Sequence, residues 1–257
     1  MPSEALRLAW DFAFRPRRGV GRVLDAPRKA PRLAGLILLA YMAASAVFYR
    51  LKPEGFPMPM EGFVPLETPH SLFFWLKVQL WTPALAAVLV AATAWFSGLL
   101  KDGKLPLRLA AAVLSAAAPV ILLVLHANGK VGTPLFAGLW VVLLAAMVPG
   151  WRALDARTWS ALGAILLAAN APALALLPAF SAAVLLRSEP LYHVLEMTLL
   201  FWTLGVCAFG VGRAREMPTA RAFAAVFLGF IAQIFFVFSM HNAGLLPKDV
   251  LKALMAV

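Results

Sequence analysis

Two apolar runs joined by a short basic link lie between residues 191 and 241. Each run has about twenty residues, the length that a helix rising about 1.5 Å per residue needs to cross the hydrocarbon core of a bilayer. The link contains Arg213, Arg215 and Arg221 against a single acid, Glu216. Because short loops rich in arginine and lysine stay on the cytoplasmic side, the pattern predicts a transmembrane hairpin whose turn faces the cytoplasm.

The composition of the whole chain is that of a polytopic membrane protein. Hydrophobic residues make up 62% of it and charged residues 14%, against about 45–50% and about 25% in soluble domains. The net charge of +11 lies at the expected membrane edges, where it orients helices and attracts anionic lipid. We therefore expect no nucleic-acid partner. The single cysteine, Cys207, excludes an intrachain disulfide and disfavours a cysteine-based metal site.

Seven apolar runs predict an all-α transmembrane helix bundle. The fourth run has only about fourteen residues, so a five-span core with an extra hairpin, formed by the fourth and fifth runs, fits equally well. Pro83 in the second run, and Asn170 with Pro172 in the fifth, predict kinked or broken helices. The runs cover residues 33–49, 72–100, 105–125, 135–148 and 159–186 and the two halves of the 191–241 hairpin.

The first 32 residues form a basic segment that begins with an amphipathic helix. Leu6, Trp10 and Ala13 fall on one helical face, and such a helix lies flat in the headgroup region. The basic cluster that follows either binds anionic lipid or a partner, or only sets the topology. The lipid-interaction candidates are Trp10, Arg15, Arg17 and Arg18.

The distribution of cations predicts the orientation. Segments expected in the cytoplasm contain sixteen lysines and arginines, and segments expected outside contain six. This bias places the N-terminus in the cytoplasm. We expect the protein to span an inner or plasma membrane. We therefore expect a cytoplasmic segment at residues 1–32, a transmembrane domain at 33–242 and an extracytoplasmic tail at 243–257.

Ionisable side chains at membrane depth are costly and favour a functional hypothesis. Lys77 in the second run and Glu196 in the sixth both lie near the expected outer face, where they can pair. Together with Asn170 they are the candidate polar or ligand-binding residues within the membrane. The alternative is that Lys77 snorkels to the interface and Glu196 is a structural counter-ion.

All four histidines also lie at the expected outer ends of spans. They are His70, His126, His193 and His241. His193 and Glu196 are three residues apart and share a helical face, a spacing that metal ligands use. The metal-ligand candidates are His193, Glu196, His126 and His241.

Catalytic signatures are missing from the sequence. It contains no Gly-x-Ser-x-Gly, His-Glu-x-x-His, phosphate-loop or Gly-x-Gly-x-x-Gly pattern. The sequence therefore favours a non-enzymatic role and identifies no cofactor.

Three segments resemble the Yip (Ypt/Rab-interacting protein) domain family. They are FRPRRGVGRVLDAPRKAPRLAGLILLAYMAA before and within the first span, LPLRLAAAVLSAAAPVILLVL in the third, and FWTLGVCAFGVGRAREMPTARAFAAVFLGF in the last pair. That family typically has five spans, so the runs at 135–148 and 159–186 depart from its pattern. The resemblance implies a membrane protein that acts through protein or lipid partners, and eukaryotic members are implicated in vesicle trafficking with small GTPases.

Three functional hypotheses follow. The first is a non-enzymatic, Yip-like membrane protein whose partners are the lipid bilayer and either another protein or a second copy of the chain. The second is a small transporter or permease subunit with a path near Lys77, Asn170 and Glu196. The third is a membrane metalloprotein built on the outer histidines. A water-filled cavity that reaches Asn170 would favour transport, and clustering of three histidines would favour metal binding. An exposed lipid groove without either would favour the first hypothesis.

Overall fold

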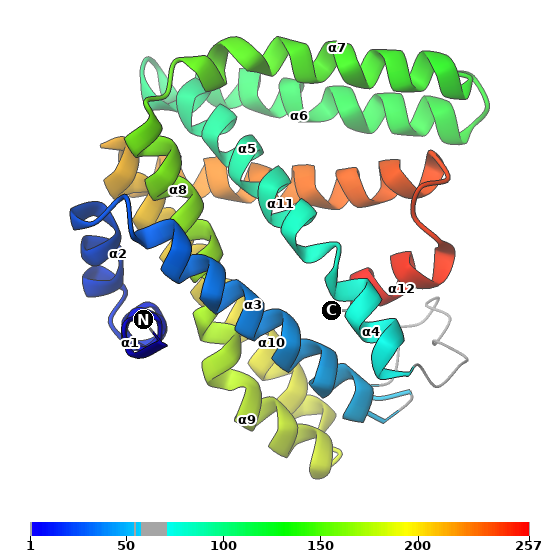
Figure 1. Cartoon of the computed structure of the whole chain (residues 1–257). Coiled ribbons are helices and arrows are strands. Elements are labelled where there is room, and N and C mark those ends of the chain that lie inside the picture. Colours follow the sequence, from blue (N-terminus) through cyan, green and yellow to red (C-terminus); the bar gives the residue numbers. More distant parts are fainter. Residues whose placement is uncertain (1, 54, 58–70, 257) are drawn as a thin grey trace.

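The computed structural model describes residues 2–53, 55–57 and 71–256, and these ranges contain helices and no strand. The helices are α1 (Pro2–Phe14), α2 (Pro16–Asp25), α3 (Ala30–Leu51), α4 (Leu72–Gln79), α5 (Thr82–Lys101), α6 (Leu105–Ala127), α7 (Thr133–Arg152), α8 (Ala156–Ala168), α9 (Ala171–Leu185), α10 (Glu189–Arg215), α11 (Thr219–Asn242) and α12 (Lys248–Ala256). Figure 1 shows their arrangement.

The predicted seven-span bundle is confirmed. Within the described ranges, seven helical segments are long and apolar enough to cross a membrane. Five of them are the continuous helices α3, α6, α7, α10 and α11, while α4 with α5 and α8 with α9 form two interrupted spans. The chain is therefore an integral, multi-pass membrane protein.

The fourth span is longer than the sequence indicated. The apolar run at 135–148 predicts about fourteen residues, whereas α7 has 20 and continues through Pro149. A proline inside a helix removes one N–H donor, and membrane helices tolerate this loss when neighbouring groups satisfy the backbone. The end of α7 is held by Trp151, whose indole N–H donates to the carbonyl of Ala91 on α5 at 2.9 Å.

Small residues bring the central helices into close contact. A methyl group added at Gly229 of α11 would lie 2.5 Å from the hydroxyl oxygen of Thr93 on α5, so only glycine fits at this crossing. The helix α8 buries Ala161, Ala164 and Ala168 in one cluster with residues of α3. Because lipid tails are as apolar as leucine, such helices associate through close van der Waals packing of small residues.

The peripheral hairpin of the bundle is α6 with α7, at the edge of the view in Figure 1. Of the residues in α7, only Phe136 is buried, and Val141 and Val142 face outward. The pair that the sequence suggested as separable, the fourth and fifth runs, includes α8, which lies in the core. The alanines of α8 fill the narrow space beside α3, whereas the bulky outward residues of α7 suit a lipid environment.

The basic turns lie at one end of the bundle. Arg221 at the start of α11 donates to three carbonyls at the end of α5, among them that of Gly103 at 2.8 Å. Arg157 at the start of α8 donates to the carbonyl of Leu24 at 3.3 Å, and Val20 of α2 packs in a cluster with the C-terminal part of α10. The arginine-rich N-terminal segment and the turns 102–104, 153–155 and 216–218 therefore share one end.

A break at Pro16 separates the first two helices, since α1 ends at Phe14 and α2 begins at Pro16. In Figure 1 α1 is seen nearly end-on while α3, α8 and α9 run across the view, so α1 crosses these helices steeply. Leu8 and Phe12 anchor α1 to the bundle. An ion pair of 3.0 Å between Asp11 and Arg22 joins it to α2.

Candidate functional site

A cavity of about 340 Å³ lies where the two interrupted spans meet. It is lined by residues of α3, α4, α5, α8, α10, α11 and α12 and by the break between α8 and α9. Among the described residues, no aspartate, glutamate, lysine or arginine lines the cavity. Its polar lining side chains are Tyr41, Gln79, Thr82, Asn170, Thr203 and Gln233.

The first wall is the break between α4 and α5. Pro83 has no N–H, so the carbonyl of Gln79, four residues earlier, loses its helical donor. The side chain of Gln79, in a residue that is only 2% exposed, accepts a hydrogen bond of 2.8 Å from the hydroxyl of Thr82. The sequence Trp-Thr-Pro thus ends one helix and starts another, with two hydrogen-bonding side chains at the junction. The kink predicted in this span is confirmed.

The second wall is the break between α8 and α9. Pro172 removes the helical donor for the carbonyl of Ala168 in the same way. The side-chain amide of Asn170, between the two helices, donates to the carbonyl of Leu167 at 2.9 Å. Within the described part of the chain this bond engages one of the two amide N–H groups, so the other N–H and the amide oxygen remain for a ligand. The broken helix predicted here is confirmed.

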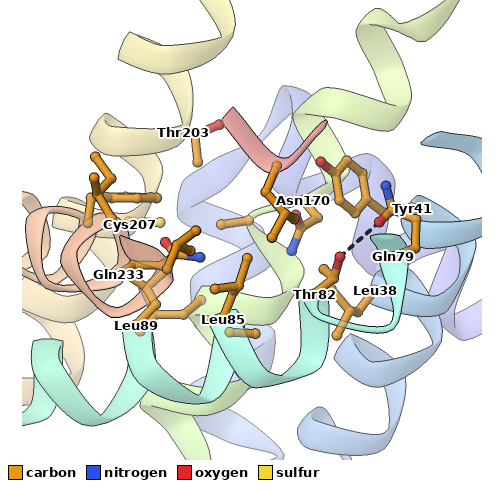
Figure 2. Close-up of a pocket in the computed structure, with 17 residues that line it drawn as sticks. Leu38, Tyr41, Gln79, Thr82, Leu85, Leu89, Asn170, Thr203, Cys207 and Gln233 are labelled. Atoms are coloured by element: carbon orange, nitrogen blue, oxygen red, sulfur yellow. Dashed lines mark hydrogen bonds between the residues drawn. The ribbon is translucent and has the colours of Figure 1, made fainter. Parts of the chain in front are cut away.

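Continuous helices complete the cavity. Figure 2 shows Asn170 between the Gln79–Thr82 pair on one side and Gln233 with Cys207 on the other. Leucine side chains from α3 and α5, including Leu38 and Leu85, form apolar parts of the wall. The site therefore offers several neutral hydrogen-bonding groups on an apolar background, which suits an uncharged polar molecule.

The helix α12 lies against one side of the cavity. Val250 and Ala253 are buried in a cluster with Trp75 of α4 and Val237 of α11. Leu254, on the same helix, lines the cavity. The segment that the sequence predicted as a tail, residues 243–257, therefore contains a helix that packs on the bundle and contributes to the site.

Asn170 is the one intramembrane candidate that the cavity contains. Lys77 is exposed on α4 and does not line the cavity. The side chain of Glu196 lies 2.9 Å from His193, and the described residues form no ion pair between Lys77 and Glu196. Of the three residues predicted to lie along a solute path, only Asn170 lines the cavity. The side chains of Lys77 and Glu196 point away from it.

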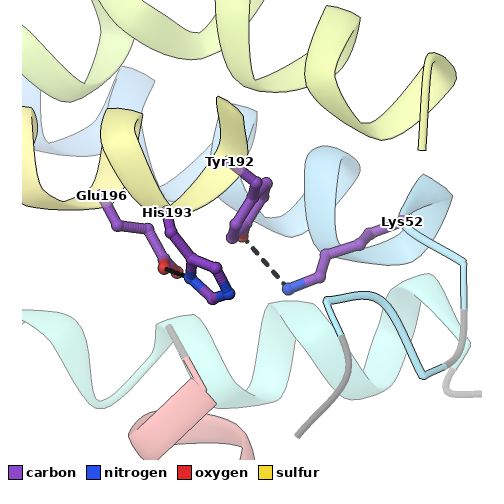
Figure 3. Close-up of polar contacts among 4 residues, drawn as sticks. All are labelled: Lys52, Tyr192, His193 and Glu196. Atoms are coloured by element: carbon purple, nitrogen blue, oxygen red, sulfur yellow. Dashed lines mark hydrogen bonds and ion pairs between the residues drawn. The ribbon is translucent and has the colours of Figure 1, made fainter. Parts of the chain in front are cut away.

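The cation near Glu196 is Lys52, at the end of α3 (Figure 3). Its ammonium donates to the hydroxyl of Tyr192 at 3.1 Å and lies 4.9 Å from the centre of that ring and 5.3 Å from the ring of Tyr49. Burial lowers the pKa of Lys52 to about 8, and the negative charge of Glu196 opposes that shift. The sequence did not single out Lys52, because it follows the apolar run.

The histidines that the structure describes contact different partners and do not form one cluster. His126 and His241 each place Nδ1 near a backbone carbonyl five residues later, Val131 at 2.7 Å and Leu246 at 2.8 Å. Since a carbonyl only accepts, each ring donates there and closes the end of its helix. His70 lies outside the described residues. No group of three histidine, cysteine, aspartate or glutamate residues in the described ranges can hold a metal ion, so only His193 and Glu196 of the predicted ligands lie together.

The predicted lipid-contacting residues are exposed at the N-terminal end. Leu6, Trp10 and Phe14, spaced four residues apart on α1, are 73%, 57% and 50% exposed. Ala13, predicted on the same face, is buried at its edge. Arg15, Arg17 and Arg18 are exposed at the end of α1 and the start of α2.

No family model, curated protein or solved structure matches this chain. The resemblance to the Yip family therefore stays a prediction.

Sequence reasoning missed most of the cavity. Gln79 and Thr82 carried a usable signal, since they flank a proline inside an apolar run as Asn170 does. Tyr41 and Thr203 carried none, because each lies within a continuous helix with no proline beside it. Gln233 on α11 also lines the cavity.

Proposed function

We propose that this integral membrane protein is a small transporter or permease that binds an uncharged polar solute in the cavity at its two helix breaks. One observation carries the proposal: the interruptions of the second and fifth spans, far apart in sequence, meet at the same cavity. Discontinuous helices that expose backbone groups at membrane depth are tolerated where they line a cavity, and in transporters they form the substrate site.

The lining sets the class of solute. A charged solute brought to this depth needs a counter-charge to offset its desolvation, and the lining residues that the structure describes provide none. The amides of Gln79, Asn170 and Gln233 donate and accept hydrogen bonds, so hydroxyl- or amide-bearing neutral molecules fit the chemistry. A cavity of about 340 Å³ lies at the small end of the usual range for ligand sites, about 300–1,000 Å³.

Thiol accessibility tests whether water reaches the breaks. In a Cys207→Ser background, Thr82→Cys and Asn170→Cys place thiols in the cavity, and Val141→Cys on the exposed face of α7 is the matched lipid-facing control. The reactive species is the thiolate, which forms in water and not in hydrocarbon. We expect a water-soluble methanethiosulfonate reagent to modify the two cavity cysteines faster than the control. Equal rates at all three positions would exclude a hydrated site.

Solute flux tests the transport step. Proteoliposomes containing the full chain, given gradients of urea, glycerol or glucose, should pass at least one of these neutral probes faster than protein-free liposomes. Asn170→Leu should reduce that flux, because it removes the amide and retains an apolar side chain of similar size. Flux of none of the probes, together with unreactive cavity cysteines, would disprove the proposal.

The surface of α1 favours a second role at the membrane surface, of the kind that the Yip resemblance implies. Its exposed stripe of Leu6, Trp10 and Phe14 next to Arg15 and Arg17 fits an interfacial helix that contacts acidic lipid with the N-terminus in the cytoplasm. A spin label at Trp10→Cys should report a depth at the boundary of headgroups and acyl chains. A label fully exposed to water would contradict this role.

A further inference from the structure

A second cavity, of about 600 Å³, is an apolar groove between α3 and α9. On α3 the groove is lined by Ala40, Ala43 and Ala44, whose small side chains leave the space open. At its rim Val47 is 48% and Leu185 is 84% exposed, so the groove opens on the surface of the bundle. Both helices belong to predicted spans, which places this opening against lipid.

The groove has the dimensions of one lipid chain in one leaflet. Its wall on α3 extends from Ala40 to Lys52, about 18 Å at a helical rise of about 1.5 Å per residue. A single leaflet contributes about half of the roughly 30 Å hydrocarbon core. An extended acyl chain therefore runs most of the length of the groove.

One end of the groove carries a positive charge. Lys52 lines the groove, and its ammonium bonds to a neutral phenol, that of Tyr192, at 3.1 Å. Among the described residues no carboxylate lies within ion-pair distance of Lys52, and the nearby Glu196 contacts His193 at 2.9 Å. A cation at the mouth of an apolar groove complements an anionic headgroup joined to an apolar chain.

We infer that this groove is a binding site for an acidic phospholipid, whose acyl chain lies along the alanines of α3 and whose phosphate contacts the ammonium of Lys52. The site is separate from the cavity at the helix breaks and from the arginines of α1 and α2. It would hold lipid against α3 and α9, the second of which follows the break at Asn170.

Native mass spectrometry of the detergent-purified full chain tests the inference, with phosphatidylglycerol and phosphatidylcholine of identical acyl chains as probes. We expect the wild type to prefer phosphatidylglycerol. Lys52→Gln should weaken that binding about five-fold, the effect of one cation at a membrane surface. It should weaken phosphatidylcholine binding less, because the choline cation offsets the charge of the phosphate. Arg50→Gln, an exposed cation two residues away that does not line the groove, is the matched control and should behave as the wild type.

Two further variants distinguish the effects of the positive charge and of the open groove on lipid binding from general damage to the fold. Lys52→Arg keeps the charge and should keep the preference for phosphatidylglycerol. Ala44→Trp fills the groove and should reduce binding of both lipids, while the elution volume and melting temperature of the protein report that it is folded. The inference is overturned if Lys52→Gln retains the preference, if Lys52→Arg loses it, or if Ala44→Trp leaves lipid binding unchanged.

Discussion

Gly229 and Thr93 show how one missing side chain allows two spans to meet. A methyl group at Gly229 would lie 2.5 Å from the hydroxyl oxygen of Thr93 and 3.2 Å from a methyl of Leu89. Thr93 is fully buried, so neither side chain has space to move away. The contact joins α5 to α11, and Leu89 also lines the cavity, so this crossing shapes the site as well as the core.

Gly229→Ala should lower the free energy of unfolding by about 1–3 kcal/mol, the cost of overpacking a core contact. Adding Thr93→Ala should recover part of the loss, because it removes the clashing hydroxyl. Unfolding by denaturing detergent, followed by circular dichroism, measures both effects. Gly138→Ala is the control, since a methyl group there meets no atom within 4 Å. Equal losses at Gly138 and Gly229 would show that the crossing is loose.

Lys52 should titrate well below an ordinary lysine, with a pKa of about 8 instead of 10.5. Its folded-state pKa is lower than its unfolded-state pKa, so between pH 8 and 10.5 the unfolded chain binds the additional proton and stability rises with pH. This contribution is lost as the pH falls through 8. Carbon-13 NMR of reductively methylated protein, with Lys52→Gln to assign the signal, measures the pKa. A value near 10.5 would mean that water solvates the ammonium.

Interrupted helices are the elements on which the proposed function rests. In both α4–α5 and α8–α9 a proline removes a backbone donor within a span, and in both a side-chain amide lies next to the break, Gln79 and Asn170. The helix α12 adds a third element, because Leu254 reaches the same cavity.

Ending the chain after Pro247 removes α12 and should expose the cavity. We expect the reaction of Thr82→Cys with a methanethiosulfonate reagent, in the Cys207→Ser background, to become several-fold faster in the truncated protein. The lipid-facing Val141→Cys should keep its rate, which controls for general loosening. An unchanged rate at Thr82→Cys would show that α12 does not restrict access to the cavity.

The whole molecule has two chemically different ends. One end gathers the N-terminal segment and the arginine-bearing turns, as the bonds of Arg221 and Arg157 show. The other gathers the ends of α6 and α11, where Val131 and Ala243 pack in one cluster. Because seven helical segments in the described ranges are long and apolar enough to cross a membrane, we expect α1 and α12 on opposite faces of the membrane.

Labelling with an impermeant maleimide tests this arrangement. In the Cys207→Ser background, Arg17→Cys and Arg213→Cys should react from the same side of sealed membrane vesicles. Lys130→Cys and Lys248→Cys should react from the opposite side, and all four residues are exposed in the structure. If vesicles of one orientation label Arg17→Cys and Arg213→Cys differently, an odd number of spans separates them and the seven-span topology fails.

The sequence by itself determined the class of fold, the seven apolar runs and the two broken helices. Their signals are local: the length of an apolar run, an arginine-rich link, or a proline such as Pro83 or Pro172 within a run. The same reasoning identified Asn170, because a polar residue beside a proline is visible along the chain. The same reasoning predicted a fourth span that was too short. The helix continues through Pro149 because tertiary contacts such as that of Trp151 hold its end.

Only the tertiary structure decided which residues share a site. Tyr41, Gln79, Asn170 and Gln233 lie on four different spans, and their meeting depends on how small residues such as Gly229 let those spans cross. The same packing separated Lys77 from Glu196 and placed Lys52 near Glu196 instead. Hydrophobicity fixes that a segment enters the membrane, but its rotation and its neighbours follow from close packing among helices that are all equally apolar.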